Sequence, residues 1–221
     1  MNESDSLLSG LPVLQRFALA YAPASARLPT LALLALDTRL AGILRGASEP
    51  MLARLRLAWW REQLATDMAR WPEGEPLLDA LRSWQGEHAA LVGLVEGWEH
   101  LTGQAPLPAS ALENLAEARG HAFAALAHRL GLPGDADAAL RSGRNWALAD
   151  LAARLSHADE QGAARELLQV QDWRRARLSR GMRPLAVLHG LAARGARQGR
   201  ALVHPSPADF AAALRLGLLG R

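Results

Sequence analysis

Apolar residues recur along this chain at intervals of three and four, and this helical period continues from one end to the other. Alanine, leucine and arginine dominate the composition, and β-branched residues are scarce, which favours helix over strand. Glycine and proline interrupt the pattern near residues 21–29, 47–50, 71–76, 102–108, 131–137, 180–184 and 204–207. We therefore predict an all-α protein of roughly eight to ten helices.

None of these interruptions is long or polar enough to be a flexible linker, and no repeat of fixed period is found. Half of the 221 residues are apolar, which is ample for one packed core. We predict a single domain over residues 1–221, with residues 1–10 flexible. The helix predicted at 28–44 is apolar around most of its circumference, which indicates burial on several sides in a bundle around a central helix or apolar cavity.

Composition narrows the classes of function. The chain has no cysteine, so disulfides and thiolate metal sites are excluded, and the sequence contains no HExxH, GxSxG or P-loop motif. The chain has no lysine, so all 25 residues of the Lys and Arg count are arginines, and the net charge of +3 is too modest to indicate nucleic-acid binding. The chain begins with acids rather than a signal peptide's positive charge, and no apolar run approaches the roughly 20 residues of a membrane span.

Localisation is predicted from the same features. The composition, rich in arginine and alanine, is typical of a GC-rich bacterial genome. We predict a cytoplasmic protein without a transmembrane segment, with peripheral contact at the inner membrane left open.

Two serines predict helix starts. Ser48 and Ser206 each precede a proline by one or two residues, which suits an N-cap followed by proline in the first turn. The seven tryptophans lie mostly among leucine and alanine, so core packing is the expected role of most of them. Arg54 and Arg61, seven residues apart, are expected to share one face of a helix.

The stretch "YAPASARLPTLALLALDTRLAGILRGASEPMLARLRLAWWREQL" resembles the N-terminal part of the squalene/phytoene synthase family. There, a helix with a DDxxD motif precedes one with a "WRxEL" pattern, which corresponds to "WWREQL" here. The stretch "RSGRNWALADLAARLSHADE" is similar to a later helix of that family, which carries the second aspartate-rich motif. The resemblance implies an isoprenoid-synthase-like helical bundle around an apolar cavity, with Mg²⁺ and prenyl diphosphates held by the two acidic motifs.

The acidic motifs themselves are missing from this chain. Ala41, Gly42 and Arg45 take the places of the first three acids, and Arg154 and Ala158 those of the second pair. Asp37 and Asp150 remain, each four residues before a lost acid and therefore on the same helix face. Asp150 and Arg154 are also spaced for an ordinary helix ion pair.

Three interpretations follow. The first is a catalytically degenerate member of the family that acts as an assembly, scaffold or lipid-binding protein, with a protein partner or a prenyl or lipid ligand. The branch containing complex I assembly factors, to which "ALDTRLAGI" is also similar, implies such a use.

The second is a prenyltransferase with a reduced Mg²⁺ site at Asp37 and Asp150. Arg54, Arg61 and Arg154 would bind diphosphate, and Trp60 would line the pocket. The third is a plain helical interaction module, whose interior would have no pocket beyond methyl-sized voids.

Overall fold

The computed structural model of the protein describes residues 3–47, 49–174, 177–199 and 206–219. Within them every regular element is a helix, as the sequence period predicts. The α-helices are α1 (Glu3–Gly10), α2 (Val13–Leu19), α3 (Ala24–Gly46), α4 (Pro50–Ala65), α5 (Pro76–Leu81), α6 (Val92–Glu99), α7 (Ala109–Arg129), α8 (Ala136–Arg154), α9 (Ala158–Gln169), α10 (Arg183–Arg197) and α11 (Pro207–Leu219). None of these helices is both long enough and apolar enough to cross a lipid bilayer.

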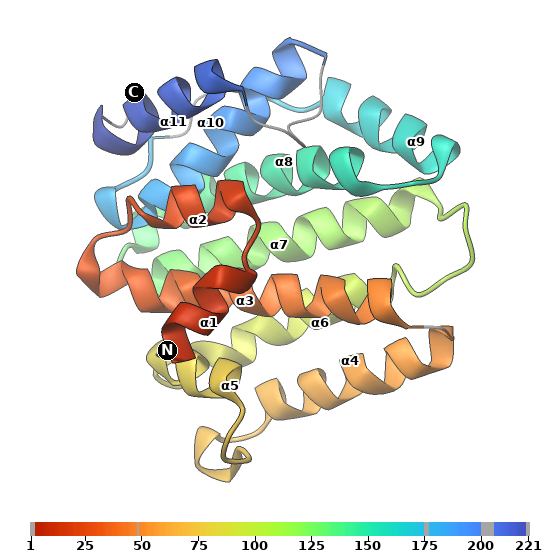
Figure 1. Ribbon diagram of the computed structural model, residues 1–221, viewed down its shortest axis with the longest axis vertical. Helices are drawn as coiled ribbons and strands as arrows, with labels where there is room; N and C mark the ends of the chain where they lie inside the picture. Colours follow the sequence, from red (N-terminus) through yellow and green to blue (C-terminus); the bar gives the residue numbers. More distant parts are fainter. Residues whose placement is uncertain (1–2, 48, 175–176, 200–205, 220–221) are drawn as a thin grey trace.

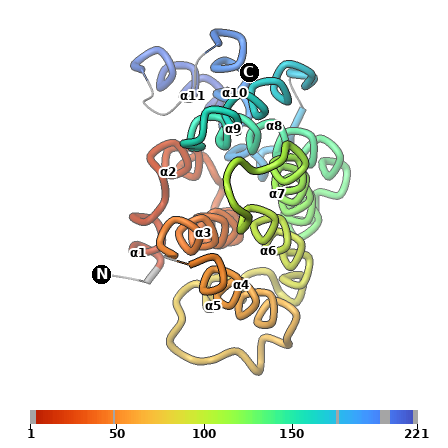
Figure 2. Tube along the Cα trace, turned by 90° about the vertical axis from the view of Figure 1, so that its right-hand side faces the viewer, coloured from red at the N-terminus to blue at the C-terminus, as the bar shows by residue number. Residues whose placement is uncertain are grey.

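The two longest helices, α3 and α7, cross the middle of the molecule (Figure 1). In the view turned by 90°, α2 and α3 lie on one side and α7 and α8 on the other (Figure 2). The helices α9, α10 and α11 cover one end of this arrangement, and α4 and α5 cover the opposite end (Figure 1). One hydrophobic cluster includes residues from all of these helices, so a single core holds the described elements together.

The central helix α3 begins earlier than the sequence predicts. It starts at Ala24 rather than at Leu28, and Pro29 lies inside it. Pro29 is in the second turn, where its missing N–H removes one helical hydrogen bond, and the residue whose carbonyl loses it, Ser25, is exposed to water. The carbonyl of Pro29 accepts a hydrogen bond from Nε1 of Trp84 at 3.2 Å, which ties α3 to the segment after α5.

The chain also folds into more helices than the predicted eight to ten. Residues 1–10 were expected to be flexible, but Glu3–Gly10 forms α1, and its residues Leu7 and Leu8 pack against the core. The second family-like stretch was expected to be one helix. It is divided instead, because α8 ends at Arg154 and α9 begins at Ala158.

The helices α7 and α8 approach each other closely at two glycines. A Cβ atom at Gly120 would lie 2.7 Å from the carbonyl oxygen of Leu140, and one at Gly143 would lie 3.1 Å from Cα of Gly120. Any side chain at these positions would push the two helices apart. This contact fixes the distance between the helices that carry Arg119 and Asp150.

Ser206 caps α11 as predicted. Its hydroxyl donates to Oδ2 of Asp209 at 2.7 Å, and the backbone N–H of Asp209 lies 3.3 Å from the serine oxygen. The other predicted cap, Ser48, lies outside the described residues. Five of the seven tryptophans are buried, which confirms their role in the core, whereas Trp59 and Trp173 are partly exposed.

Candidate functional site

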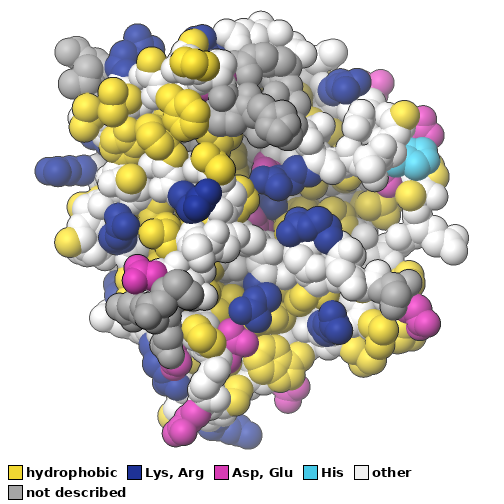
Figure 3. Space-filling model, viewed as in Figure 1, with side chains coloured by type: hydrophobic (Ala, Val, Ile, Leu, Met, Phe, Trp, Pro, Cys, Tyr) yellow, Lys and Arg dark blue, Asp and Glu magenta, His cyan; other side chains and the backbone are white. Residues whose placement is uncertain are grey.

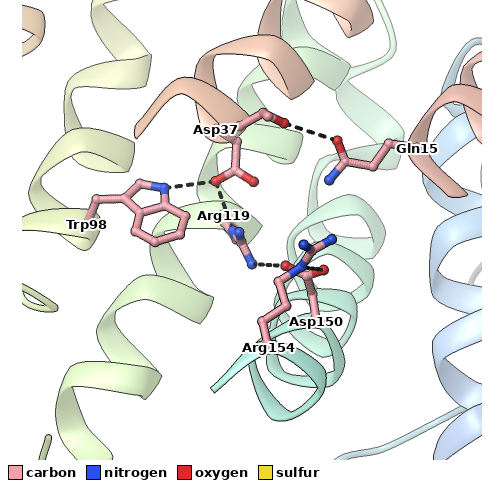
Figure 4. A network of polar contacts seen from close by, with 7 residues as sticks. Gln15, Asp37, Trp98, Arg119, Asp150 and Arg154 are labelled. Atoms are coloured by element: carbon pink, nitrogen blue, oxygen red, sulfur yellow. Dashed lines mark hydrogen bonds and ion pairs between the residues drawn. The ribbon is translucent and has the colours of Figure 1, made fainter. Parts of the chain in front are cut away.

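Four helices bring a network of polar side chains together inside the bundle. Asp37 comes from α3, Trp98 from α6, Arg119 from α7 and Asp150 from α8 (Figure 4). The two aspartates that the sequence analysis singled out therefore do converge. The side chain that joins them is Arg119, which the sequence analysis did not single out.

Arg119 bonds to both carboxylates at once. Its Nε donates to Oδ1 of Asp37 at 2.9 Å, and its Nη1 donates to Oδ2 of Asp150 at 3.2 Å. The side chains of Arg119 and Asp37 are 4% and 5% exposed, and that of Asp150 is 11% exposed. A guanidinium can span two carboxylates in this way because its donors form a planar fork.

Two indole rings enclose the guanidinium. Cζ of Arg119 lies 5.1 Å from the ring centroid of Trp98 and 5.1 Å from that of Trp146. Contact of a cation with an aromatic face is favourable and is stronger where water is excluded. Nε1 of Trp98 also donates to Oδ1 of Asp37 at 2.9 Å, so the same ring holds both members of the ion pair.

The electrostatic balance keeps Arg119 charged. Burial is the largest single influence and by itself lowers the pKa of Arg119, but the charges and hydrogen bonds of Asp37 and Asp150 together outweigh it and leave the pKa raised. The network therefore contains a permanent positive charge between two carboxylates.

Arg154 supplies a second cation at the outer edge of the network. Its Nε donates to Oδ1 of Asp150 at 2.6 Å, which confirms the predicted helix ion pair, and its side chain is 47% exposed. On the other side, Gln15 of α2 accepts a hydrogen bond from Thr38, the residue after Asp37, at 3.4 Å (Figure 4). Arg154 thus carries the network to the surface near the end of α8, and the bond between Gln15 and Thr38 joins α2 to α3 beside it.

The other predicted substrate-binding residues lie elsewhere, on α4. Nε of Arg54 donates to Oγ1 of Thr102 at 3.0 Å, and Nη1 of Arg61 donates to Oε2 of Glu99 at 2.9 Å, so both arginines do share the face toward the end of α6. Trp60 is 3% exposed and lines neither of the cavities described here. The structure brings Asp37, Asp150 and Arg154 together through Arg119, whereas Arg54 and Arg61 bond to other residues.

A cavity of about 530 Å³ lies next to the network, between α2, α8, α9 and α10. Trp146 and Asp150 belong both to the network and to the cavity wall. The space exists because α8 and α10 present small residues to it, namely Ala149, Ala152, Ala153, Ala192, Gly195 and Ala196. A second cavity, of about 430 Å³, lies between α1, α3, α4 and α5.

The donor set of the network does not fit Mg²⁺. This ion prefers six oxygen ligands in an octahedron and is commonly held by carboxylates. Asp37 and Asp150 are both bonded to Arg119, and Asp150 is also bonded to Arg154, so cationic side chains already neutralise the two carboxylates. Among the described residues no group of three or more acids or histidines is placed to hold a metal ion.

Arg119 could not have been identified from the sequence alone. It lies in "ENLAEARGHAF", where an arginine near glutamates is typical of a solvent-exposed helix face. Its partners are 82 and 31 residues away along the chain. The indirect signal came from Asp37 and Asp150 instead, because an aspartate among apolar residues on a helix needs a buried polar partner.

Comparison of the chain with protein-family models, with curated proteins and with solved structures finds no match in any of the three.

Proposed function

We propose that this chain is a squalene/phytoene synthase-like helical protein without prenyl-transfer activity, which acts as an assembly or scaffold protein and binds an apolar ligand in the cavity beside the network. The observation that carries this proposal is the position of Arg119. Its guanidinium lies between the two aspartates that a reduced metal site would need.

The chemistry of prenyl transfer argues for this choice. Ionisation of a prenyl diphosphate requires metal ions to neutralise the leaving group, and carboxylates must hold those ions. Arg119 is buried, bonded to both aspartates and enclosed by Trp98 and Trp146. To admit Mg²⁺ it would have to leave this environment and expose two carboxylates to each other, which is costly.

The cavity supports binding of an apolar molecule. Its volume of about 530 Å³ lies within the usual range for small-molecule sites, which is about 300–1,000 Å³. Its walls are built largely from alanine, leucine and tryptophan. The exposed residues Arg165 and Arg197 also line it and could bond to a carboxylate or phosphate at one end of the ligand.

The two other interpretations have less support. A prenyltransferase would use Asp37 and Asp150 as free metal ligands, and both are bonded to arginine. A plain interaction module would have an interior without pockets, and the cavity between α8 and α10 is at odds with that expectation.

The experiment measures binding of a fluorescent fatty acid and its displacement by farnesol, in the wild type and in two variants. Ala196→Phe places a ring in the cavity and should weaken binding about tenfold or more. Ala211→Phe, at an exposed alanine of α11, is the matched control and should bind as the wild type does. Equal affinity in all three proteins would contradict the cavity as the binding site.

A second arm tests the loss of catalysis. The wild type is incubated with farnesyl or geranylgeranyl diphosphate and Mg²⁺, and the products are analysed. We expect neither Mg²⁺-dependent binding nor a condensed product. A condensed product that requires Mg²⁺ would overturn the proposal and favour the enzyme.

A further inference from the structure

The helix α4 has two apolar faces, and only one of them is covered. Its inner face packs into the core through Ala53, Leu57, Trp60 and Leu64. Its outer face carries four exposed apolar residues, the outer stripe, which are Met51, Leu52, Leu55 and Trp59. Met51 and Leu55 are each 61% exposed, which is costly in water unless another surface covers them.

The outer stripe is continuous along α4, and a buried ring supports its tryptophan. Met51, Leu55 and Trp59 follow one another at intervals of four, so they lie on one line along the helix. The ring of Trp59 contacts that of Trp60 edge to face, with 4.9 Å between centroids, so the buried indole supports the exposed one.

Arginines flank the outer stripe on both sides. With 100° between successive residues, Arg56 lies along one edge, and Arg54 and Arg61 lie along the other. All three are exposed. Arg61 is paired with Glu99 at 2.9 Å, and Glu62, the one acidic residue of α4, lies on the line of the outer stripe beyond Trp59. Arg54 and Arg56 therefore supply the positive charge beside Met51 and Leu55. Figure 3 shows hydrophobic side chains gathered over α4 at the lower right, with arginine side chains above them.

We infer that the outer face of α4 docks onto an anionic lipid bilayer. An apolar stripe flanked by arginines is the pattern of helices that lie in the plane of a membrane surface. The apolar side chains enter the boundary between headgroups and acyl chains, and the guanidinium groups of Arg54 and Arg56 bind lipid phosphates above it. Trp59 suits the interface because its indole has an apolar body and one N–H donor. The charge of the flanks selects a negatively charged surface over a neutral one.

The position of α4 permits this contact. It lies at one end of the molecule, away from α9, α10 and α11, so a flat surface can approach it (Figure 1). The inference does not rest on the proposed function, because neither the cavity beside the network nor Arg119 takes part in it.

The test is co-sedimentation of the full chain with vesicles. Vesicles of phosphatidylglycerol and phosphatidylcholine in equal parts are compared with vesicles of phosphatidylcholine alone. We expect binding to the anionic vesicles that weakens as salt is raised, and little binding to the neutral ones. The tryptophan emission should shift to shorter wavelength on binding, and the shift should shrink in Trp59→Phe.

Two variants make the test specific. The double variant Met51→Ser, Leu55→Ser should bind about tenfold more weakly or worse, because it removes two side chains that enter the bilayer. Val170→Ser, at the end of α9 and 78% exposed, is the matched control and should bind like the wild type. Circular dichroism confirms that each variant is folded.

Three outcomes would overturn the inference. The first is absence of binding to anionic vesicles. The second is binding that the double variant retains in full. The third is a dimer in solution that the double variant disperses, together with no vesicle binding, since the outer stripe would then be a contact between copies of the chain.

Discussion

Arg119 and Asp37 form an ion pair of 2.9 Å in which both side chains are almost completely buried. Such a pair is sensitive to the loss of either partner, because the remaining charge is left without solvent or counter-ion. Arg119 has a second buried partner in Asp150, so its removal leaves Asp37 without its charged partner and leaves Asp150 with Arg154 alone.

The first prediction concerns Arg119→Met. The variant should lose about 3–5 kcal/mol in the free energy of unfolding, measured by urea denaturation at pH 7. Arg154→Met is the control and should lose less than about 1 kcal/mol, because its ion pair with Asp150 is half exposed to solvent. Adding Asp37→Asn and Asp150→Asn to Arg119→Met should restore part of the loss. Similar losses in the two single variants would contradict this account of the network.

The second prediction concerns the crossing of α7 and α8. Gly120→Ala should lower the free energy of unfolding by about 1–3 kcal/mol, because its Cβ would lie 2.7 Å from a backbone oxygen. Gly42→Ala, inside α3 with no atom within 4 Å of the added Cβ, should instead raise it by about 0.5–1 kcal/mol. Thermal and urea unfolding of the two variants measure these opposite changes in the free energy of unfolding. An increase in both variants would show that α7 and α8 can move apart without cost.

The third prediction concerns pH. His189 is buried, and its ring stacks on Trp173 with 5.9 Å between centroids. Burial, with a smaller effect of Arg197, lowers the pKa of His189 to about 4, while Asp172 acts in the opposite direction. The unfolded chain, in which the pKa is about 6.5, therefore binds the proton more tightly than the folded one.

Stability should accordingly be complete above pH 6.5 and should fall as the pH decreases toward 4, by about 3 kcal/mol from this residue. The measurement is urea unfolding across this range for the wild type and for His189→Phe, which keeps a ring but cannot titrate. The free energy of unfolding of the wild type should fall relative to that of His189→Phe as the pH decreases. The exposed His121→Gln serves as the control and should follow the wild type, and a His189→Phe profile parallel to that of the wild type would contradict the prediction.

The fourth prediction concerns metal. Mg²⁺ with inorganic pyrophosphate should leave the thermal midpoint of the wild type unchanged, because Arg119 and Arg154 already neutralise Asp37 and Asp150. The check is a thermal scan with the metal and with a chelator. A rise in midpoint that needs both ions and is lost in Asp37→Asn would show that a metal site forms there.

The helical class was predictable because it depends on local period and on proline and glycine, which act within a few residues. The start of α3 was misplaced because a proline in the second turn looks like a break, although its cost is small where the residue that loses the hydrogen bond, Ser25, is exposed. The end of α8 was missed as well. The break after Arg154 has no proline or glycine, and it is supported by Nδ1 of His157, which accepts from the backbone N–H of Asp159.

The candidate site was half predictable. Asp37 stands out as the one acid of the apolar helix α3, and Asp150 as an acid amid alanine and leucine in α8; the structure places both on one guanidinium. Arg119 does not stand out, because its role depends on the crossing of α7 with α3 and α8. The exposure of Met51 and Leu55 was equally hidden, since a sequence does not say which apolar face of α4 meets the core.

The bridge of Arg119 also restricts how this chain can change over generations. Removing the arginine first leaves Asp37 buried without its charged partner, and removing an acid first leaves a buried guanidinium with one partner. Either single step passes through a weakened protein, and most proteins have only about 5–15 kcal/mol of stability to lose. Metal binding by Asp37 and Asp150 would need several substitutions together, so no single substitution leads from this network to a metal site.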